Sequence, residues 1–394
     1  MEARTHLQPL ILGVETSCDE TAAAVVRGGR DVLSNVVASQ HDLHEEFAGV
    51  VPEIASRAHL ERILPVIRAA MREAGLQYND LGAIAIGHRP GLIGSLLVGV
   101  SAAKALAWSL GKPLIGVDHI VAHLFACELS PPPFEGGGTG VGETSVVDGR
   151  VHPHPVPPPP RGGGDSGAAA SNITFPALGL VVSGGHTSLL LLRDALDIEL
   201  IGRTIDDAAG EAFDKAATIL ELGYPGGPAV DRLSRDGNHR AHDFPIAQLG
   251  SDSLDFSFSG LKTALLYAVK GVPQGRGGNA IFARDASMLS DQQKADFAAS
   301  FQRAVVRAIV RRVERALERF PQATCLVIGG GVSANSRLRA DLSALSTKRG
   351  IELRLPPPAY CIDNAAMIAG YAARKFERAA FDDLTLAAAT SASI

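Results

Sequence analysis

The chain has 394 residues, of which 46% are hydrophobic and 20% are charged, and its formal net charge is −5. This composition is typical of a globular protein of about two or three domains. It excludes attraction of nucleic acid through overall charge, so such a partner would need a local basic patch. No uncharged apolar run reaches the roughly 18 residues of a membrane helix, and no signal peptide is visible. We therefore expect no membrane partner, and the four scattered cysteines suit a reducing compartment.

Residues 10–26 and 177–192 share one plan, in which two apolar runs flank a polar or glycine-containing turn. Each predicts a β-hairpin whose turn lets backbone N–H groups approach a ligand. Two such hairpins, one in each half, favour an α/β fold of two lobes with duplicated β-hairpin/α units and an interlobe cleft. Two ordinary hairpin turns would give the same pattern, and the pattern alone does not separate these alternatives.

Helical periodicity is found in residues 55–75, 95–111 and 300–320. The third segment is amphipathic, with apolar residues on one side and a row of arginines on the other. The row consists of Arg303, Arg307, Arg311 and Arg315. It is suited either to a phosphate backbone or to a solvated helix face.

His119 and His123 lie four residues apart, a spacing that places both imidazoles on one face of a helix. Zinc proteases present two ligands in this way, but their H-E-x-x-H motif has a glutamate where this chain has Ile120. Further on, Asp363 and Asn364 open a predicted helix within residues 356–373. Asp363 could be a helix cap or a third metal ligand, and its distance in sequence from the histidines leaves both open.

Residues 131–174 are rich in proline, glycine and serine, so we predict a disordered insertion there. Beyond it, residues 324–342 predict a strand, a glycine turn and a helix opening around Ser333 or Asn335, which is suited to an anion. Residues 204–220 carry a cluster of acids, and Gly226-Gly227 and Asp231 follow. These acids could contact a ribose or an amino group, or simply complement a helix dipole.

Several segments together resemble one family. In order they are "GVETSCDET", "GVVPEIASRAH", "PGLIGSLLVG", "DHIVAH", "VSGGHT", "TIDDAAGEAFDK", "YPGGPAVD", "DFSFSGLKTA", "GGGVSANSRLR" and "CIDNAAMIA". They resemble the tRNA N6-adenosine threonylcarbamoyltransferase (TsaD) family, formerly called O-sialoglycoprotein endopeptidase. The resemblance runs from about Leu12 to about Tyr371 and skips the insertion. It implies the actin–hexokinase–Hsp70 fold.

The resemblance also implies an activity and a site. The reaction is transfer of threonylcarbamoyl from threonylcarbamoyl-AMP to N6 of the adenosine beside the anticodon, in tRNAs reading codons that begin with A. One divalent metal ion per subunit, Fe(II) or Zn(II), matches His119, His123 and Asp363. The adenylate site matches Val181, Val182, Ser183, Gly184, Gly185, Asp214, Gly227, Asp231 and Asn335. The implied partners are tRNA, a catalytically silent TsaB-like paralogue and a small TsaE-like ATPase. The wording of the matching segments resembles bacterial members, which favours the cytoplasm as the compartment.

On this basis we expect a first lobe of residues 8–118 with 364–394, and a second lobe of residues 119–363 holding the metal and the adenylate. Asp19 and Glu20 are candidates to accept the amine proton. The chain departs from the family pattern at His88-Arg89, where small residues are usual, and at Ala365, which replaces a glycine. A metalloprotease and a silent nucleotide-binding scaffold are the alternatives. The missing glutamate argues against the first, and the retained ligand set argues against the second.

Overall fold

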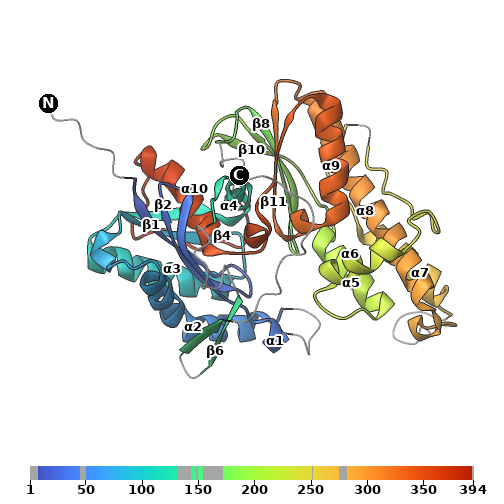
Figure 1. Cartoon of the computed structure of the whole chain (residues 1–394), viewed down its shortest axis with the longest axis horizontal. Helices are drawn as coiled ribbons and strands as arrows, with labels where there is room; N and C mark the ends of the chain where they lie inside the picture. The colour runs from blue at the N-terminus through green and yellow to red at the C-terminus, as the bar shows by residue number, and fades with distance from the viewer. Residues whose placement is uncertain are drawn as a thin grey trace. The chain divides into compact units, whose positions relative to one another are not determined.

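The computed structural model describes residues 8–44, 50–131, 143–147, 150–153, 172–250, 252–274 and 282–392. The chain divides into two compact units (Figure 1). Unit 1 comprises Met1–Ile173 and Pro356–Ile394, and unit 2 comprises Thr174–Leu355. Each unit contains one β-sheet and its own helices.

Unit 1 is built on a seven-stranded sheet of order β5-β4-β1-β2-β3-β6-β7. Its strands are β1 (Leu10–Glu15), β2 (Thr21–Arg27), β3 (Asp31–Ala38), β4 (Ala83–Arg89), β5 (Leu114–Asp118), β6 (Glu143–Val147) and β7 (Arg150–Pro153). Strand β1 pairs antiparallel with β2, which confirms the first predicted hairpin, and parallel with β4. The α-helices of unit 1 are α1 (His41–His44), α2 (Pro52–Glu73), α3 (Ile93–Leu110), α4 (His119–Phe125) and α10 (Ala365–Glu377).

The central strand β1 is covered on both faces, because alternate residues of a strand point to opposite sides of the sheet. Leu12 and Val14 belong to an apolar core shared with α2 and α3. Gly13 faces α10 so closely that a Cβ atom there would lie 2.4 Å from the carbonyl oxygen of Ala365. The last helix of the chain therefore packs directly on the first strand.

Helix α3 is the one helix in the described part of the chain that is long and apolar enough to cross a membrane by length and composition. It includes Lys104 and packs against α2 and β4 within unit 1. These contacts are those of a helix that covers a sheet.

Unit 2 is built on a five-stranded sheet of order β10-β9-β8-β11-β12. Its strands are β8 (Ala177–Val182), β9 (Thr187–Leu192), β10 (Ile198–Arg203), β11 (Cys325–Gly329) and β12 (Glu352–Arg354). Strands β8 and β9 are antiparallel, which confirms the second hairpin. The α-helices of unit 2 are α5 (Ala209–Leu220), α6 (Gly226–Leu233), α7 (Ser259–Lys270), α8 (Asp291–Arg319) and α9 (Ser336–Arg349).

The long helix α8 extends nine residues further toward the N-terminus than its amphipathic pattern suggested. Ser290 caps it and accepts a hydrogen bond from the backbone N–H of Gln293. Its apolar face, which includes Phe301, Val305 and Ile309, enters the main core of unit 2. The arginine row lies on the opposite side, and its members differ in their contacts. Arg315 donates to the carbonyls of Gly250 and Ser253, whereas Arg307 is exposed.

Two features of unit 1 differ from the predicted organisation. Residues 119–173 and 356–363 belong to unit 1, because α4 follows β5 without a linker and packs on α10. In addition, the range 131–174 contains β6 and β7, which pair antiparallel, and β6 pairs with β3. The β-branched residues of this range favour strands, and Asp148-Gly149 is a typical hairpin signal in the sequence. The proline, glycine and serine around these residues obscured that signal. The rest of the predicted insertion, except Pro131 and residues 172–174, lies outside the described residues.

The end of the chain runs along β5, the edge strand of the unit 1 sheet. Asp382 forms an isolated antiparallel bridge with Leu114, and its carboxylate accepts a hydrogen bond from the backbone N–H of Gly116. Farther along, the backbone N–H of Ala389 donates to the carbonyl of His88. These contacts occupy part of a strand edge that would otherwise be open.

Candidate metal centre and substrate-binding elements

The two histidines are held by an abrupt strand-to-helix junction. Asp118, the last residue of β5, caps α4 by accepting hydrogen bonds from the backbone N–H groups of Ile120 and Val121 at 3.0 and 3.3 Å. His119 is therefore the first residue of the helix, and His123 lies one turn later. Both side chains are buried, with exposed fractions of 3% and 1%.

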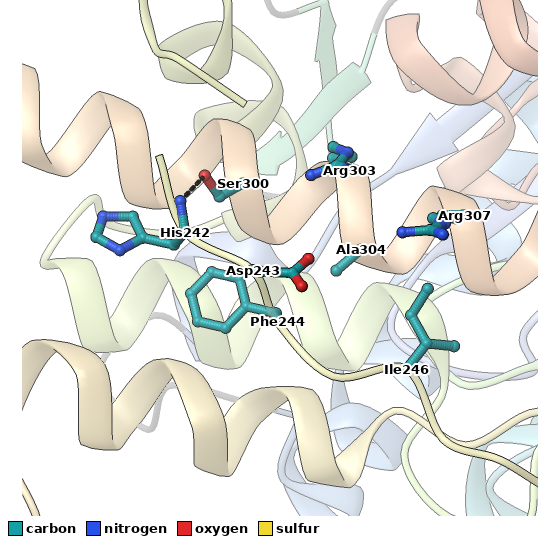
Figure 2. Close-up of a pocket in the computed structure, with 8 residues that line it drawn as sticks. All are labelled: His242, Asp243, Phe244, Ile246, Ser300, Arg303, Ala304 and Arg307. Atoms are coloured by element: carbon teal, nitrogen blue, oxygen red, sulfur yellow. Dashed lines mark hydrogen bonds between the residues drawn. The ribbon is translucent and has the colours of Figure 1, made fainter. Parts of the chain in front are cut away.

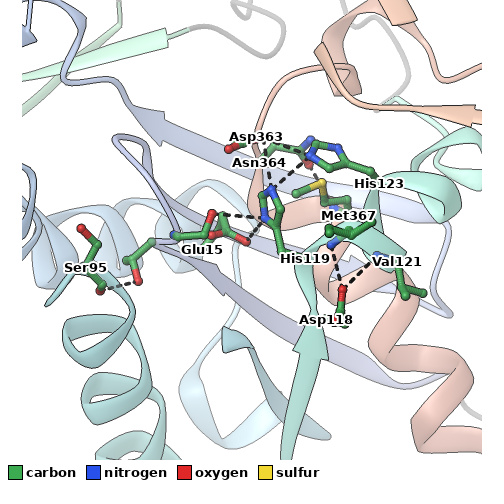
Figure 3. A network of polar contacts seen from close by, with 12 residues as sticks. Glu15, Ser95, Asp118, His119, Val121, His123, Asp363, Asn364 and Met367 are labelled. Carbon is green, nitrogen blue, oxygen red and sulfur yellow. Dashed lines mark hydrogen bonds and ion pairs between the residues drawn. The ribbon is translucent and has the colours of Figure 1, made fainter. Parts of the chain in front are cut away.

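The third member of the centre comes from the loop before α10. Asp363 Oδ1 lies 3.1 Å from His123 Nε2 and 3.5 Å from His119 Nε2 (Figure 3). The two Nε2 atoms are 3.2 Å apart. The cap of α10 is the next residue, Asn364, whose side chain accepts from the backbone N–H of Met367. Asp363 is thus free of the capping role and points toward the histidines.

This arrangement suits a metal ion. Ligands about 2.1 Å from a tetrahedral ion lie about 3.4 Å from one another, close to the three distances found here. Two imidazoles and a carboxylate form a donor set typical of zinc or iron(II). The three ligand atoms all lie within 4.8 Å of one another, so this group could hold a metal. The Nδ1 atom of His123, on the far side of its ring, is buried and has no hydrogen-bond partner among the described residues.

The charges of the centre also favour a bound cation. Burial lowers the pKa of His119, but the carboxylates of Asp363 and Glu15 outweigh it and raise that pKa well above its usual value. Burial raises the pKa of Asp363, and the two imidazoles reverse this and hold it well below its usual range. Two carboxylates therefore flank the His119 ring, and a divalent cation held at this centre would balance their negative charge.

The turn between β1 and β2 carries the two candidate proton acceptors. Asp19 and Glu20 are half-buried and follow Cys18, whose thiol pKa is raised by burial and by nearby carboxylates, Asp363 among them. His59 of α2 holds this turn. Its Nδ1 lies 2.8 Å from Thr21 Oγ1, and its Nε2 lies 3.0 Å from the carbonyl oxygen of Cys18. The turn is therefore a fixed part of unit 1 near the metal centre.

In unit 2, the turn between β8 and β9 presents its glycines to open space. No atom lies within 4 Å of a Cβ built at Gly184 or Gly185. The turn is closed by two hydrogen bonds between Ser183 and His186. Beneath it, the backbone N–H of Gly210 at the start of α5 donates to the carbonyl of Ser183. Gly184 and Gly185 are thus exposed on a turn that these hydrogen bonds hold in place.

The other predicted substrate residues of unit 2 form a network at the ends of α5, α6 and α9. Asp214 accepts a hydrogen bond from the backbone N–H of Gly226 at 2.9 Å, and burial raises the pKa of its carboxyl. Asp231 Oδ1 accepts from the backbone N–H and the hydroxyl of Ser336 at 3.2 and 2.7 Å. Asn335 caps α9 by accepting from the backbone N–H of Leu338. Each side chain therefore already has a structural contact.

The turn after β11 lies against the end of β8, which places Asn335 near the glycine turn. A Cβ at Gly330, where φ is +87°, would lie 2.4 Å from the carbonyl oxygen of Val182. Only glycine tolerates both the backbone angle and this approach. The residues from Val181 to Gly185 and the start of α9 thus belong to one region of unit 2.

Comparison with known proteins decides the family. A sequence profile described as "TsaD: tRNA N6-adenosine threonylcarbamoyltransferase" matches residues 31–136 and 166–370. The tRNA N6-adenosine threonylcarbamoyltransferase of Rhodopirellula baltica is 47% identical over 97% of this chain and 96% of its own length. That of Symbiobacterium thermophilum is 48% identical over 91% of this chain and 89% of its own length. The chain belongs to the tRNA N6-adenosine threonylcarbamoyltransferase family.

Solved structures agree on the fold. Full-length HypF in a phosphate- and nucleotide-bound form matches with a TM-score of 0.55 and 13% identity, covering 96% of this chain and 48% of HypF. HypF of T. kodakarensis matches with a TM-score of 0.53 and 14% identity, over 96% of this chain and 49% of its own. The expected actin–hexokinase–Hsp70 class is confirmed. The protein is an acyltransferase that transfers a threonylcarbamoyl group to N6 of adenosine in tRNA.

The structure accounts for the chain's departures from the family pattern. Arg89 Nε lies 3.3 Å from Asp118 Oδ2, so the bulky cation pairs with the carboxylate that caps α4. His88 Nδ1 contacts the carbonyl of Ala387 in the C-terminal segment. Ala365, in place of a glycine, is the first residue of α10 and is fully buried. None of these residues replaces a member of the His119–His123–Asp363 group.

Sequence reasoning missed the residues that support the centre. Asp118 was not recognised as the cap of α4, although aspartate directly before a helix is a capping signal. Glu15 was also missed, although a carboxylate at the end of an apolar strand is unusual. It is fully buried, and its Oε2 lies 3.0 Å from His119 Nδ1. His59 appeared in sequence as one member of a helical pattern, with no sign that it reaches the β1–β2 turn.

Proposed function

We propose that the donor in this reaction is threonylcarbamoyl-AMP and that the acceptor is the adenosine beside the anticodon in tRNAs reading codons that begin with A. We further propose that transfer depends on one divalent metal ion, Fe(II) or Zn(II), held by His119, His123 and Asp363. The observation that carries the metal proposal is the convergence of two Nε2 atoms and Oδ1 within 3.5 Å of one another. When bound, such an ion supplies positive charge that polarises a carbonyl or phosphoryl oxygen.

The reaction requires positioning more than a strong nucleophile, because the donor is a reactive mixed anhydride. The N6 amine attacks the carbamoyl carbon, a C–N bond forms, the C–O bond to the phosphate breaks, and AMP leaves. The amine loses one proton. Asp19 and Glu20 are the candidates to accept it, because the β1–β2 turn fixes them near the metal centre.

Unit 2 supplies groups that suit the adenylate. The open glycine backbone of Gly184 and Gly185 would approach a phosphate or a carbonyl, as small residues permit. Gly227 is equally unobstructed, and Asp231 and Asn335 lie at the adjoining helix ends. Val181, Val182, Ser183 and Asp214 would shape this region. We assign these residues to binding and none of them to proton transfer.

We also propose a TsaB-like paralogue and a TsaE-like ATPase as partners, with the cytoplasm as the compartment. Support for a protein partner comes from apolar side chains exposed on α2 and α3. Leu60 and Leu64 are 65% and 52% exposed, one turn apart on α2, and Leu97 and Trp108 of α3 are 51% and 75% exposed. Helices α2 and α3 pack on each other, and exposed apolar side chains on such a surface suit a protein interface.

For the alternative of a metalloprotease, a general base would have to lie beside the histidines. The glutamate near them, Glu15, faces His119 Nδ1 and the backbone N–H of Ser17. A carboxylate with both oxygens engaged in this way is poorly placed to activate water.

The test is His123→Ala, with His239→Ala in unit 2 as the matched control. We expect His123→Ala to lose both bound metal, measured by mass spectrometry of the purified protein, and N6-threonylcarbamoyladenosine in tRNA from complemented cells. Circular dichroism should show an unchanged fold, and the control should retain both signals. A metal-free His123→Ala protein that modifies tRNA at the wild-type rate, in an assay stripped of metal, would refute the proposal.

A further inference from the structure

We propose that Glu15 is a positioning residue of the metal centre. Its carboxylate fixes the ring and the tautomer of His119 so that the Nε2 lone pair is presented to the metal. The inference rests on the proposed metal function and adds a residue outside the ligand set. Figure 3 shows Glu15 on the side of the His119 ring opposite His123 and Asp363.

The first support is the pair of contacts that hold the carboxylate. Glu15 is the last residue of β1 and is fully buried. Its Oε1 accepts a hydrogen bond from the backbone N–H of Ser17 at 2.5 Å, and its Oε2 lies 3.0 Å from His119 Nδ1. Because one oxygen is tied to the main chain, the other is fixed in position. Nδ1 then donates its proton to Glu15, and this leaves Nε2 unprotonated when the ring is neutral.

The second support is the cost of burying this group. A carboxylate removed from water is unfavourable unless it is paired and hydrogen-bonded. Within the described residues, the ion pair of Glu15 is with His119, and no lysine or arginine side chain forms one with it. An uncharged residue would fill a purely structural role equally well. The negative charge of the Glu15 carboxylate therefore indicates that it stabilises a positively charged or metal-bound His119 ring. Carboxylate–histidine pairs behind metal ligands have this property.

The third support is a glycine that makes room for the carboxylate. Gly87 lies on β4, the neighbour of β1, and a Cβ there would be 2.5 Å from Glu15 Oε2. Any side chain at position 87 would therefore push the carboxylate away from His119. The two strands together keep this pair intact.

The two histidines are not equivalent in this respect. The Nδ1 of His119 meets Glu15 and, at 3.2 Å, the hydroxyl of Ser17. The Nδ1 of His123 has no partner among the described residues. The orientation of the centre is thus set mainly through His119, and Ser17 offers a weaker, uncharged contact to the same atom.

The experiment measures Zn²⁺ binding to metal-free full-length protein in competition with a chromophoric chelator. Glu15→Gln should raise the dissociation constant by about 10- to 100-fold, the usual effect of removing such a partner. The amide oxygen of glutamine can still accept the hydrogen bond from the backbone N–H of Ser17, but the amide nitrogen then offers only N–H groups to His119 Nδ1. This would favour the tautomer in which Nε2 carries the proton. Ser17→Ala should change the constant far less. The absorption spectrum of the Co²⁺-loaded protein should change in Glu15→Gln and stay as in the wild type in Ser17→Ala.

A second variant reaches the same pair without altering Glu15 itself. Gly87→Ala should weaken Zn²⁺ binding in the same direction. Gly82→Ala, where the nearest atom to the new Cβ is 3.5 Å away, is the matched control and should bind normally. Thermal unfolding of each metal-free variant identifies those that fold.

Wild-type affinity and an unchanged Co²⁺ spectrum in Glu15→Gln, with binding abolished in His123→Ala, would overturn the inference and leave the metal proposal standing. A wild-type protein that binds neither Zn²⁺ nor Co²⁺ would overturn the proposed metal function and this inference with it.

Discussion

Replacement of Asn364 by alanine should destabilise unit 1 and loosen the metal centre together. The Asn364 side chain is fully buried and makes three hydrogen bonds at the start of α10. Its Oδ1 accepts from the backbone N–H of Met367 at 3.0 Å, and its Nδ2 donates to the carbonyls of Ile362 at 2.8 Å and Tyr360 at 3.4 Å. These bonds close the loop that holds Asp363.

The magnitude follows from these contacts. Loss of a helix cap costs about 1 kcal/mol, and loss of buried hydrogen bonds to two carbonyls adds about 1–2 kcal/mol. The free energy of unfolding should therefore fall by about 2–3 kcal/mol, which lowers the melting temperature of a unit of this size by about 5–10 °C. Asn364→Ser is the matched control, because serine retains the capping oxygen and loses the two donors.

The assay is urea unfolding of the metal-free protein, followed by Zn²⁺ titration at a temperature where both variants are folded. We expect weaker binding in Asn364→Ala than in wild type, with Asn364→Ser between them. A free energy of unfolding within about 0.5 kcal/mol of wild type, the scatter of neutral surface substitutions, would show that these bonds are not needed and refute the reasoning.

Two further predictions concern His59 and Arg307. Burial lowers the pKa of His59 below 6.5, so the folded protein binds fewer protons there than the unfolded chain does. The contribution of His59 to the free energy of unfolding should therefore be fully present above pH 6.5 and be lost as the pH drops toward 5. Chemical unfolding across this range should show a smaller loss of stability in His59→Gln than in wild type. If the arginine row of α8 contacts tRNA, Arg307→Ala should reduce the slope of log affinity against log salt by about 0.7–0.9, one phosphate contact. Arg349→Ala is the control, because Arg349 is paired with Glu314 and Glu318. Equal slopes for Arg307→Ala and wild type would show that the arginine row is a solvent-exposed helix face.

Local patterns in the sequence predicted local structure well. The pairing of β1 with β2 and of β8 with β9 follows from apolar runs that flank short turns. The helix at residues 300–320 follows from its 3.6-residue period, and only its capped beginning was missed. His119 and His123 share a helix face, as their spacing requires. In each case the interacting residues lie close together in the sequence.

Contacts between distant segments could not be obtained in this way. Asp363 joins His123 across about 240 residues, and the spacing left its role open until the family resemblance suggested it. Glu15 meets His119 across 104 residues, and no period in either segment indicates this contact. The predicted lobe boundaries differ from the units for the same reason, because residues 119–173 and 356–363 belong to unit 1 and α4 packs on α10, which lies far from it in the sequence. The hairpin of β6 and β7 was hidden by the proline and glycine around it.

The discontinuity of unit 1 has a consequence for its synthesis on the ribosome. Strand β1 and helix α4 are made early, but α10, which packs on β1, belongs to the last segment of the chain, after all of unit 2. At about 5–20 residues per second, the roughly 240 residues between His123 and Asp363 take about 12–48 s to translate. Until then the two histidines lack their carboxylate and the sheet lacks its last helix. A nascent chain is therefore unable to form the complete three-residue group, and the centre can be loaded only once nearly the whole protein has been made.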